Sequence, residues 1–201
     1  MVITNDKQVH LYPLEDGRQL AFNRYGAPLG YPVLYFHGSP SSRLEAAFLH
    51  DVAASQGFLL IAPDRPGCGV SDPNPNHALL DNATDMAEFV SHLGWDHFGM
   101  IATSGGFPSL AACAFRFPEK VLFSVDLAGW APLNEMRHSY AQMTPGDRLF
   151  AFLAHYFPRL LILPFRAIGR AARQSDTERF HRLFASWLSE SDQKALDDHE
   201  M

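Results

Sequence analysis

Cysteine is scarce in this sequence, and clusters of basic residues are missing. Cys68 and Cys113 are the only cysteines among 201 residues, too few and too scattered for a disulfide framework or a metal cluster, so both are expected to be structural. The formal net charge is −6 and no basic run occurs, which argues against nucleic acids and anionic membranes as partners. The expected partner is a small-molecule substrate, and nothing indicates a metal or a cofactor.

Long uninterrupted apolar runs are missing as well. Polar side chains break up residues 1–12, so this stretch lacks the core of a secretory signal, and a cytoplasmic location is expected by default. Asp6 and His10 in this arm are expected to be solvated rather than to bind a metal. Segment 148–172 is crowded with Leu and Phe, but prolines and Arg159 interrupt it, which rules out a simple membrane span.

Short apolar runs alternate with helical stretches through most of the chain. Strands are expected at residues 9–14, 19–25, 33–36, 58–62, 98–102 and 121–127, and helices at 43–56, 82–93 and 107–117. Asp16 and Gly17 favour a hairpin between the first two strands. The alternation predicts an α/β fold, a mostly parallel sheet with flanking helices. The active site of such a sheet lies beyond the carboxyl ends of its strands.

Ser104 stands where an apolar run stops and a helix is about to begin. Two glycines, Gly105 and Gly106, follow it, and Ala102 precedes it by two residues. This is G-x-S-x-G with alanine in the first place, the pattern of a serine nucleophile held on a strained strand-to-helix turn. The alternative, a tight turn in any parallel sheet, is about as plausible from this segment alone.

Two upstream segments carry loops that follow buried strands. The loop after strand 33–36 contains Gly38 and Ser39, and the N–H of Ser39 could join that of Gly105 in stabilising a tetrahedral oxyanion. The alternative is a plain surface turn. The loop after strand 58–62 is dense in glycine and proline, and its Asp64 and Arg65 are expected to be structural rather than catalytic.

Taken together, these three segments resemble the α/β-hydrolase family, in its branch with a helical cap. The matching residues are 37–40, 64–72 and 102–106, and the resemblance extends over about residues 9–135. It implies Ser104 as nucleophile and the backbone N–H groups of Ser39 and Gly105 as the oxyanion hole. It also implies His37 and Gly38 as supports of the oxyanion loop.

The resemblance divides the chain into residues 1–133, an incomplete hydrolase core, and residues 134–201, a helical cap or lid and a C-terminal tail. In the family, an acid and a histidine on later strands complete the triad. No strand is recognisable after 121–127, so the last strands are expected to be missing and the chain truncated before both residues. The downstream candidates are not assigned as acid or base: Asp126, expected to be a hydrogen-bonded structural carboxylate, Asp147, Asp176, Asp192, Asp197, Asp198, His138, His155, His181 and His199.

Two functions follow. The first is a serine hydrolase that cleaves an ester, thioester or amide of a small apolar substrate through an acyl-Ser104 intermediate. An esterase is the first expectation, and a proline-releasing aminopeptidase is the second. The aromatic segment 148–172 is interpreted either as a lid or simply as packed helix. The family's dehalogenases and epoxide hydrolases carry an aspartate at the nucleophile position, which the serine argues against. The second function is a non-catalytic binding protein, or a chain that a partner completes; marginal solubility or a homodimer is then expected.

Overall fold

The computed structural model describes residues 9–75, 78–129 and 143–173. The chain forms two compact units, Met1–Pro132 and Leu133–Met201, and each is described by itself. The sequence placed this boundary between residues 133 and 134; the assignment of the second unit as a cap stays a prediction.

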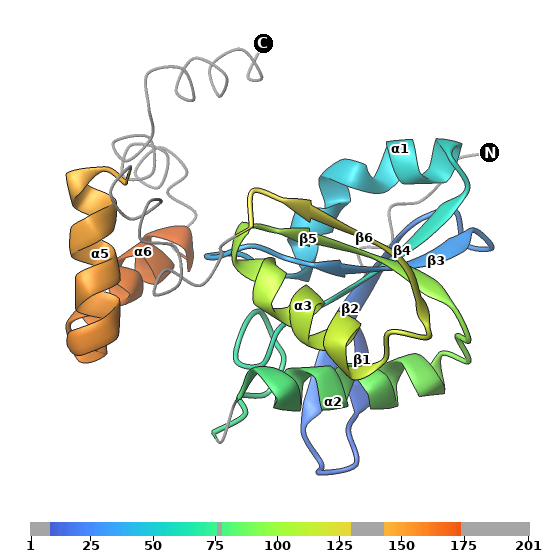
Figure 1. Cartoon of the computed structure of the whole chain (residues 1–201), viewed down its shortest axis with the longest axis horizontal. Helices are drawn as coiled ribbons and strands as arrows, with labels where there is room; N and C mark the ends of the chain where they lie inside the picture. The colour runs from blue at the N-terminus through green and yellow to red at the C-terminus, as the bar shows by residue number, and fades with distance from the viewer. Residues whose placement is uncertain (1–8, 76–77, 130–142, 174–201) are drawn as a thin grey trace. The chain divides into compact units, whose positions relative to one another are not determined.

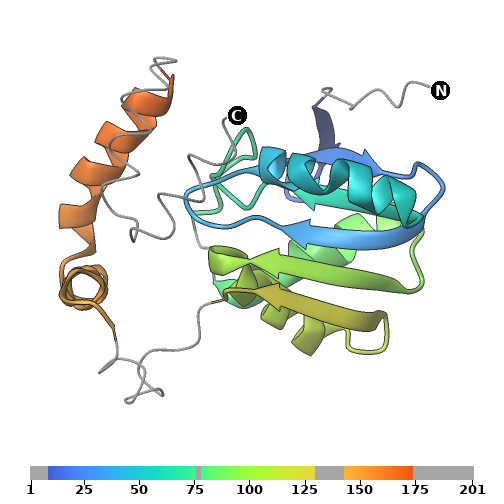
Figure 2. The same cartoon turned by 90° about the horizontal axis from the view of Figure 1, so that it is seen from above.

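The first unit is built on a six-stranded sheet with the order β1-β2-β4-β3-β5-β6 (Figures 1 and 2). The strands are β1 His10–Pro13, β2 Gln19–Gly26, β3 Tyr31–Phe36, β4 Phe58–Pro63, β5 Phe98–Thr103 and β6 Val121–Leu127. β2 runs antiparallel to β1 and β4, whereas the pairs β3–β4, β3–β5 and β5–β6 are parallel. The predicted mostly parallel α/β sheet is confirmed.

Helices cover both faces of this sheet. The 3₁₀ helix η1 Arg43–Leu49 and α1 His50–Ser55 lie on one face, and α2 Leu79–His92 and α3 Phe107–Arg116 lie on the other (Figure 1). The single helix expected at 43–56 is therefore two. The expected start of α2 at residue 82 was three residues late, because the carboxylate of Asp81 accepts the N–H of Ala78 at 2.9 Å and begins the helix there.

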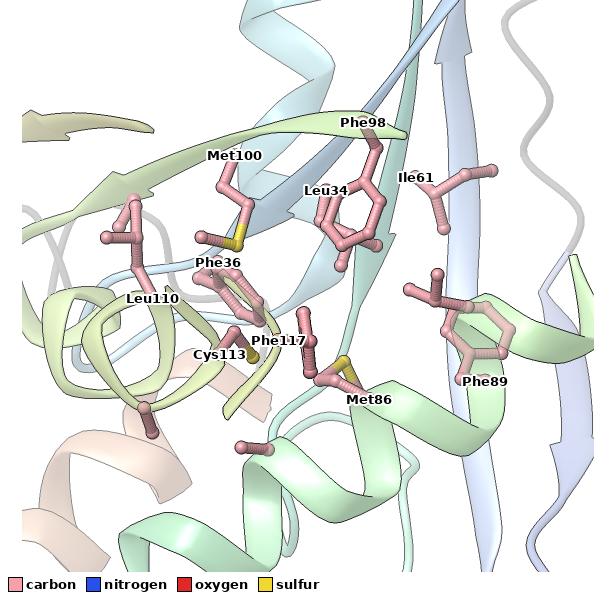
Figure 3. Close-up of a cluster of buried hydrophobic side chains, with 14 of the residues drawn as sticks. Leu34, Phe36, Ile61, Met86, Phe89, Phe98, Met100, Leu110, Cys113 and Phe117 are labelled. Carbon is pink, nitrogen blue, oxygen red and sulfur yellow. The ribbon is translucent and has the colours of Figure 1, made fainter. Parts of the chain in front are cut away.

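The larger core lies between the sheet and the helices α2 and α3 (Figure 3). It gathers side chains from β3, β4, β5, α2 and α3: Leu34, Phe36, Ile61, Met86, Phe89, Phe98, Met100, Leu110, Cys113 and Phe117. Because helices cover the central strands on both sides, those strands are apolar throughout rather than alternating. Burial raises the pKa of the Cys113 thiol to about 12, which fits the structural role expected for it.

Among the strands in the described part of the chain, β6 lies at one end of the sheet order and pairs with β5 alone. Its apolar side chains are exposed: Leu122, Phe123, Val125 and Leu127. The ring of Phe123 fills the space beside Gly99 on β5, where any side chain would collide with it. The exposed edge of β6 is thus more apolar than the free edges that soluble sheets usually present.

The second unit contains α5 Pro145–Tyr156, η3 Pro158–Leu161 and α6 Ile162–Arg173. Thr144 begins α5: its Oγ1 accepts the N–H of Asp147 at 3.2 Å and donates to the Asp147 carboxylate at 2.7 Å. α5 ends before Pro158, which cannot continue a helix. Many large apolar side chains of this unit are exposed, among them Leu149, Phe152, Tyr156, Leu160 and Leu163. None of the helices in the described ranges has the length and hydrophobicity needed to cross a bilayer.

Candidate active site

Ser104 occupies a strained position between β5 and α3. It follows Thr103, the last residue of β5, and begins the one-turn helix η2 Ser104–Gly106 that leads into α3. Its φ angle is +48°, in the left-handed region that residues with a side chain seldom adopt. Such strain costs about 1–3 kcal/mol and is characteristic of functional sites. The strand–turn–helix setting that the sequence predicted for Ser104 is present.

The two glycines after Ser104 allow the ends of β3 and β5 to come together. A side chain at Gly106 would collide with the backbone carbonyl of Phe36, and one at Gly105 would collide with the hydroxyl of Ser39. The absence of side chains at 105 and 106 therefore brings the loop after β3 against the turn that carries Ser104. The two proposed oxyanion donors, the N–H groups of Ser39 and Gly105, belong to these touching segments.

Substituting Gly106 with alanine is expected to destabilise the first unit by about 1–3 kcal/mol, because the new methyl group meets backbone that cannot rotate away. Urea unfolding followed by tryptophan fluorescence measures this loss. Gly146→Ala is the matched control, since its methyl group would meet nothing closer than the Thr144 hydroxyl at 3.8 Å. Equal midpoints for the two variants would contradict the close approach.

His37 is buried beneath the loop that follows β3 and holds this loop by hydrogen bonds. Its side chain is fully buried, and its Nε2 lies 3.1 Å from the backbone N–H of Arg65, which donates to it. The ring proton therefore sits on Nδ1, which donates to the carbonyl of Gly38 at 2.9 Å. Burial, and next the charge of Arg65, lower the pKa of His37 below its ordinary value. With both ring nitrogens occupied, His37 fits the expected supporting role and is not placed to act as a base.

The neutral state of His37 predicts a loss of stability in acid. Because burial lowers its folded-state pKa, the unfolded chain binds a proton here more readily than the folded chain. This contribution is complete above the unfolded pKa of about 6.5 and is lost as pH falls through the folded pKa. We expect the free energy of unfolding to decrease less between pH 7.5 and 5 in His37→Gln than in the unsubstituted chain, by urea titration at each pH. His97→Gln, at an exposed position, is the control and should keep the full dependence.

A second network lies beneath the oxyanion loop. The Glu45 carboxylate accepts the N–H of Gly38 at 3.0 Å and the hydroxyl of Tyr35 at 2.7 Å. The Tyr35 hydroxyl also lies 2.8 Å from the hydroxyl of Thr103, the residue before Ser104. Burial raises the pKa of Tyr35, so it stays a neutral donor. Sequence analysis missed Glu45 and Tyr35; the one available signal was an acidic residue in the first turn after the loop.

Asp64 and Arg43 form a buried ion pair behind the loop. The Asp64 carboxylate accepts the Arg43 backbone N–H at 2.6 Å, its guanidinium Nη1 at 2.7 Å and the N–H of Val70 at 3.0 Å. The Nε of Arg43 donates to Asn23 on β2 at 2.8 Å. Every oxygen of Asp64 is thus engaged, and the expected structural role of Asp64 fits these contacts.

Within the described part of the first unit, no contact brings the candidate acid Asp126 to Ser104. Asp126 pairs in register with Ala102 on β5, is exposed, and fills the space beside Gly129. Asp147 caps α5, and His155 on α5 lies edge-on against Tyr156 at 4.5 Å between ring centres. His138, His181, His199, Asp176, Asp192, Asp197 and Asp198 lie outside the described residues. No group of three or more His, Cys, Asp or Glu within the described ranges could hold a metal ion.

Comparisons with known proteins match this geometry to one fold. A family model described as alpha/beta hydrolase fold matches residues 31–158. A Bacillus subtilis protein named "Uncharacterized hydrolase YcgS" is 27% identical over 188 residues, covering 84% of this chain and 65% of the relative. A soluble epoxide hydrolase of Corynebacterium sp. is 41% identical over 78 residues, 38% of this chain and 27% of the relative. A putative acyltransferase of Salmonella enterica superimposes with a TM-score of 0.59 at 23% identity, over 74% of this chain and 48% of that one.

These relatives are longer than the region they share with this chain. The chain spans less than two thirds of both curated relatives and about half of the acyltransferase. The matched family region contains Ser104 and the loop after β3 but ends within the second unit.

Proposed function

Since this chain belongs to the alpha/beta hydrolase fold family, we propose that it is a serine hydrolase acting on an ester, thioester or amide of a small apolar substrate, most simply an esterase. One observation carries the proposal: the φ angle of +48° at Ser104, in a turn where Gly105 lies against Ser39. Strain at a serine beside two backbone donors has a function in acyl transfer and none in a plain βα turn.

The chemistry assigned to these residues is nucleophilic catalysis. The Oγ of Ser104 would attack the substrate carbonyl carbon while its proton passes to a general base, and the carbonyl oxygen would become negative. The N–H groups of Ser39 and Gly105 would donate to that oxygen. Collapse of the intermediate expels the protonated leaving group and leaves acyl-Ser104, and attack by water releases the acid and restores the serine.

The serine distinguishes this proposal from the chemistry named for one relative. The Corynebacterium relative is an epoxide hydrolase, and that branch of the family carries an aspartate at the nucleophile position. Here the residue is Ser104. A serine hydroxyl forms an ester with an acyl or phosphonyl group of the substrate, whereas an aspartate carboxylate forms an ester with an alkyl group. Acyl transfer is therefore the reaction that this side chain supports.

Labelling with a fluorophosphonate probe tests the proposal on the 201-residue chain. Ser104 is expected to displace fluoride and become phosphonylated, and a short-chain nitrophenyl ester should be turned over. The alternative is a binding protein with an unactivated serine; it is favoured by the engagement of both ring nitrogens of His37. A folded chain that neither labels nor turns over ester would support that alternative and overturn the hydrolase proposal.

A further inference from the structure

Arg65 connects the loop after β3, the proposed oxyanion loop, to the turn after β5 that carries Ser104, the proposed nucleophile turn. Its guanidinium Nη1 donates to the carbonyl of Gly105 at 2.8 Å, and its Nη2 donates to the carbonyl of Gly38 at 2.7 Å and to the hydroxyl of Ser39 at 2.5 Å. The three acceptors come from loops that follow β3 and β5, whereas Arg65 follows β4. One planar fork therefore joins the ends of three neighbouring strands.

The Gly38 carbonyl belongs to the same peptide unit as the N–H of Ser39. In a trans peptide the carbonyl and the N–H point in opposite directions, so fixing the carbonyl also fixes the direction of the donor. Two groups hold this carbonyl, Nη2 of Arg65 at 2.7 Å and Nδ1 of His37 at 2.9 Å. The Ser39 nitrogen lies close to Gly105: a Cβ on Gly105 would be 3.3 Å from it.

The positive charge of Arg65 is not neutralised by an ion pair. Arg18 and Arg43 each pair with a carboxylate, Asp85 and Asp64 respectively. Arg65 forms no such pair with any carboxylate in the part of the chain that the structure describes, and its partners there are two carbonyls and a hydroxyl. Because Arg65 binds backbone carbonyls rather than a carboxylate, its positive charge remains available near the place where the oxyanion would develop.

We propose that Arg65 is a positioning residue for acyl transfer at Ser104: its guanidinium holds the peptide unit that carries the Ser39 N–H in its donating orientation and, through the carbonyl of Gly105, ties that unit to the turn of Ser104. This inference rests on the proposed function and adds a consequence for catalysis to the structural role that the sequence predicted for Arg65. The backbone N–H of the same residue sets the tautomer of His37, so Arg65 acts on the Gly38 carbonyl both directly and through that ring.

The second-order rate constant of fluorophosphonate labelling tests this role. Arg65→Met keeps most of the side-chain stem and removes all three contacts; we expect labelling to slow by about 10- to 100-fold, less than the 10²–10³ that follows loss of an oxyanion donor itself. Arg65→Lys keeps the charge but not the fork and should be intermediate; it replaces the first variant if that one does not fold. For a nitrophenyl ester, kcat should fall while KM changes little. Arg116→Met, at an exposed position on α3, is the control.

Two further measurements distinguish a positioning role of Arg65 from a general contribution to the stability of the fold. Millimolar ethylguanidinium should restore part of the labelling rate of Arg65→Met, and its thermal midpoint should stay within a few degrees of the unsubstituted chain. Unchanged labelling in both Arg65 variants would overturn the inference. A slow rate that ethylguanidinium does not restore, together with a lowered thermal midpoint, would also overturn it. The hydrolase proposal would stand in both cases. No labelling of the unsubstituted chain would overturn both.

Discussion

Replacing Ser104 with alanine is expected to abolish fluorophosphonate labelling and to lower ester turnover by about three to six orders of magnitude. The alanine keeps the backbone of the turn but removes the one oxygen that can form the acyl or phosphonyl ester. Ser91→Ala, at an exposed position on α2, should label and turn over ester like the unsubstituted chain. A labelled Ser104→Ala protein would place the nucleophile elsewhere.

Ser104→Gly separates the reaction from the strain. It should be as inactive as Ser104→Ala, yet more stable than the alanine variant by up to about 1 kcal/mol, because glycine adopts the left-handed φ of +48° without the clash of a Cβ. Thermal unfolding of the two inactive variants measures that difference. An alanine variant more stable than the glycine variant would show that the turn stores no strain at this residue.

Asp64→Ala is expected to have the largest effect on stability. It leaves the Arg43 guanidinium buried without its partner, and breaking a buried pair in this way typically destabilises by about 3–5 kcal/mol. The side chains of Arg43 and Asp64 are 8% and 0% exposed, so water cannot replace the lost contact. Urea unfolding at neutral pH measures the change in the free energy of unfolding.

Asp16→Ala is the matched control for Asp64→Ala. Asp16 also pairs with an arginine, Arg18, but its side chain is 55% exposed, and exposed pairs contribute about 0–1 kcal/mol. The double variant Arg43→Met with Asp64→Leu should recover part of the loss, because it removes both charges together. Equal losses for Asp64→Ala and Asp16→Ala would contradict the burial of the first pair.

The parts of the fold that sequence analysis predicted depend on neighbouring residues. Strand runs such as 33–36 and 98–102, the Asp16–Gly17 hairpin and the turn at Ser104 are local patterns of apolar spacing and small residues. The pairing of Ser39 with Gly105 was predicted from the loops that follow two buried strands, and the structure brings those residues together.

The parts that were missed depend on which strands are neighbours. Arg65 reaches Gly38 and Gly105 only because β3 lies between β4 and β5 in the sheet, and no spacing within the loop 64–72 encodes that order. Glu45 was missed for a different reason: it accepts from Gly38 and Tyr35 because η1 returns beside the end of β3, and the spacing of residues in the sequence does not predict that return. In sequence alone Arg65 resembles an ordinary charge in a loop, and Glu45 resembles an ordinary acidic residue in the first turn of a helix.

The position of β3 also determines when the site can form during folding. β3 pairs with β4 and β5 in parallel, and parallel neighbours close only after long intervening segments have folded, which makes such pairing slow. The loop after β3 and the turn of Ser104 meet only when β5 has docked beside β3, so a partly folded chain with β1, β2 and β4 assembled would not have the proposed donor Ser39 beside Ser104. The rate at which reactivity toward a phosphonylating probe returns during refolding would therefore report when the sheet is complete.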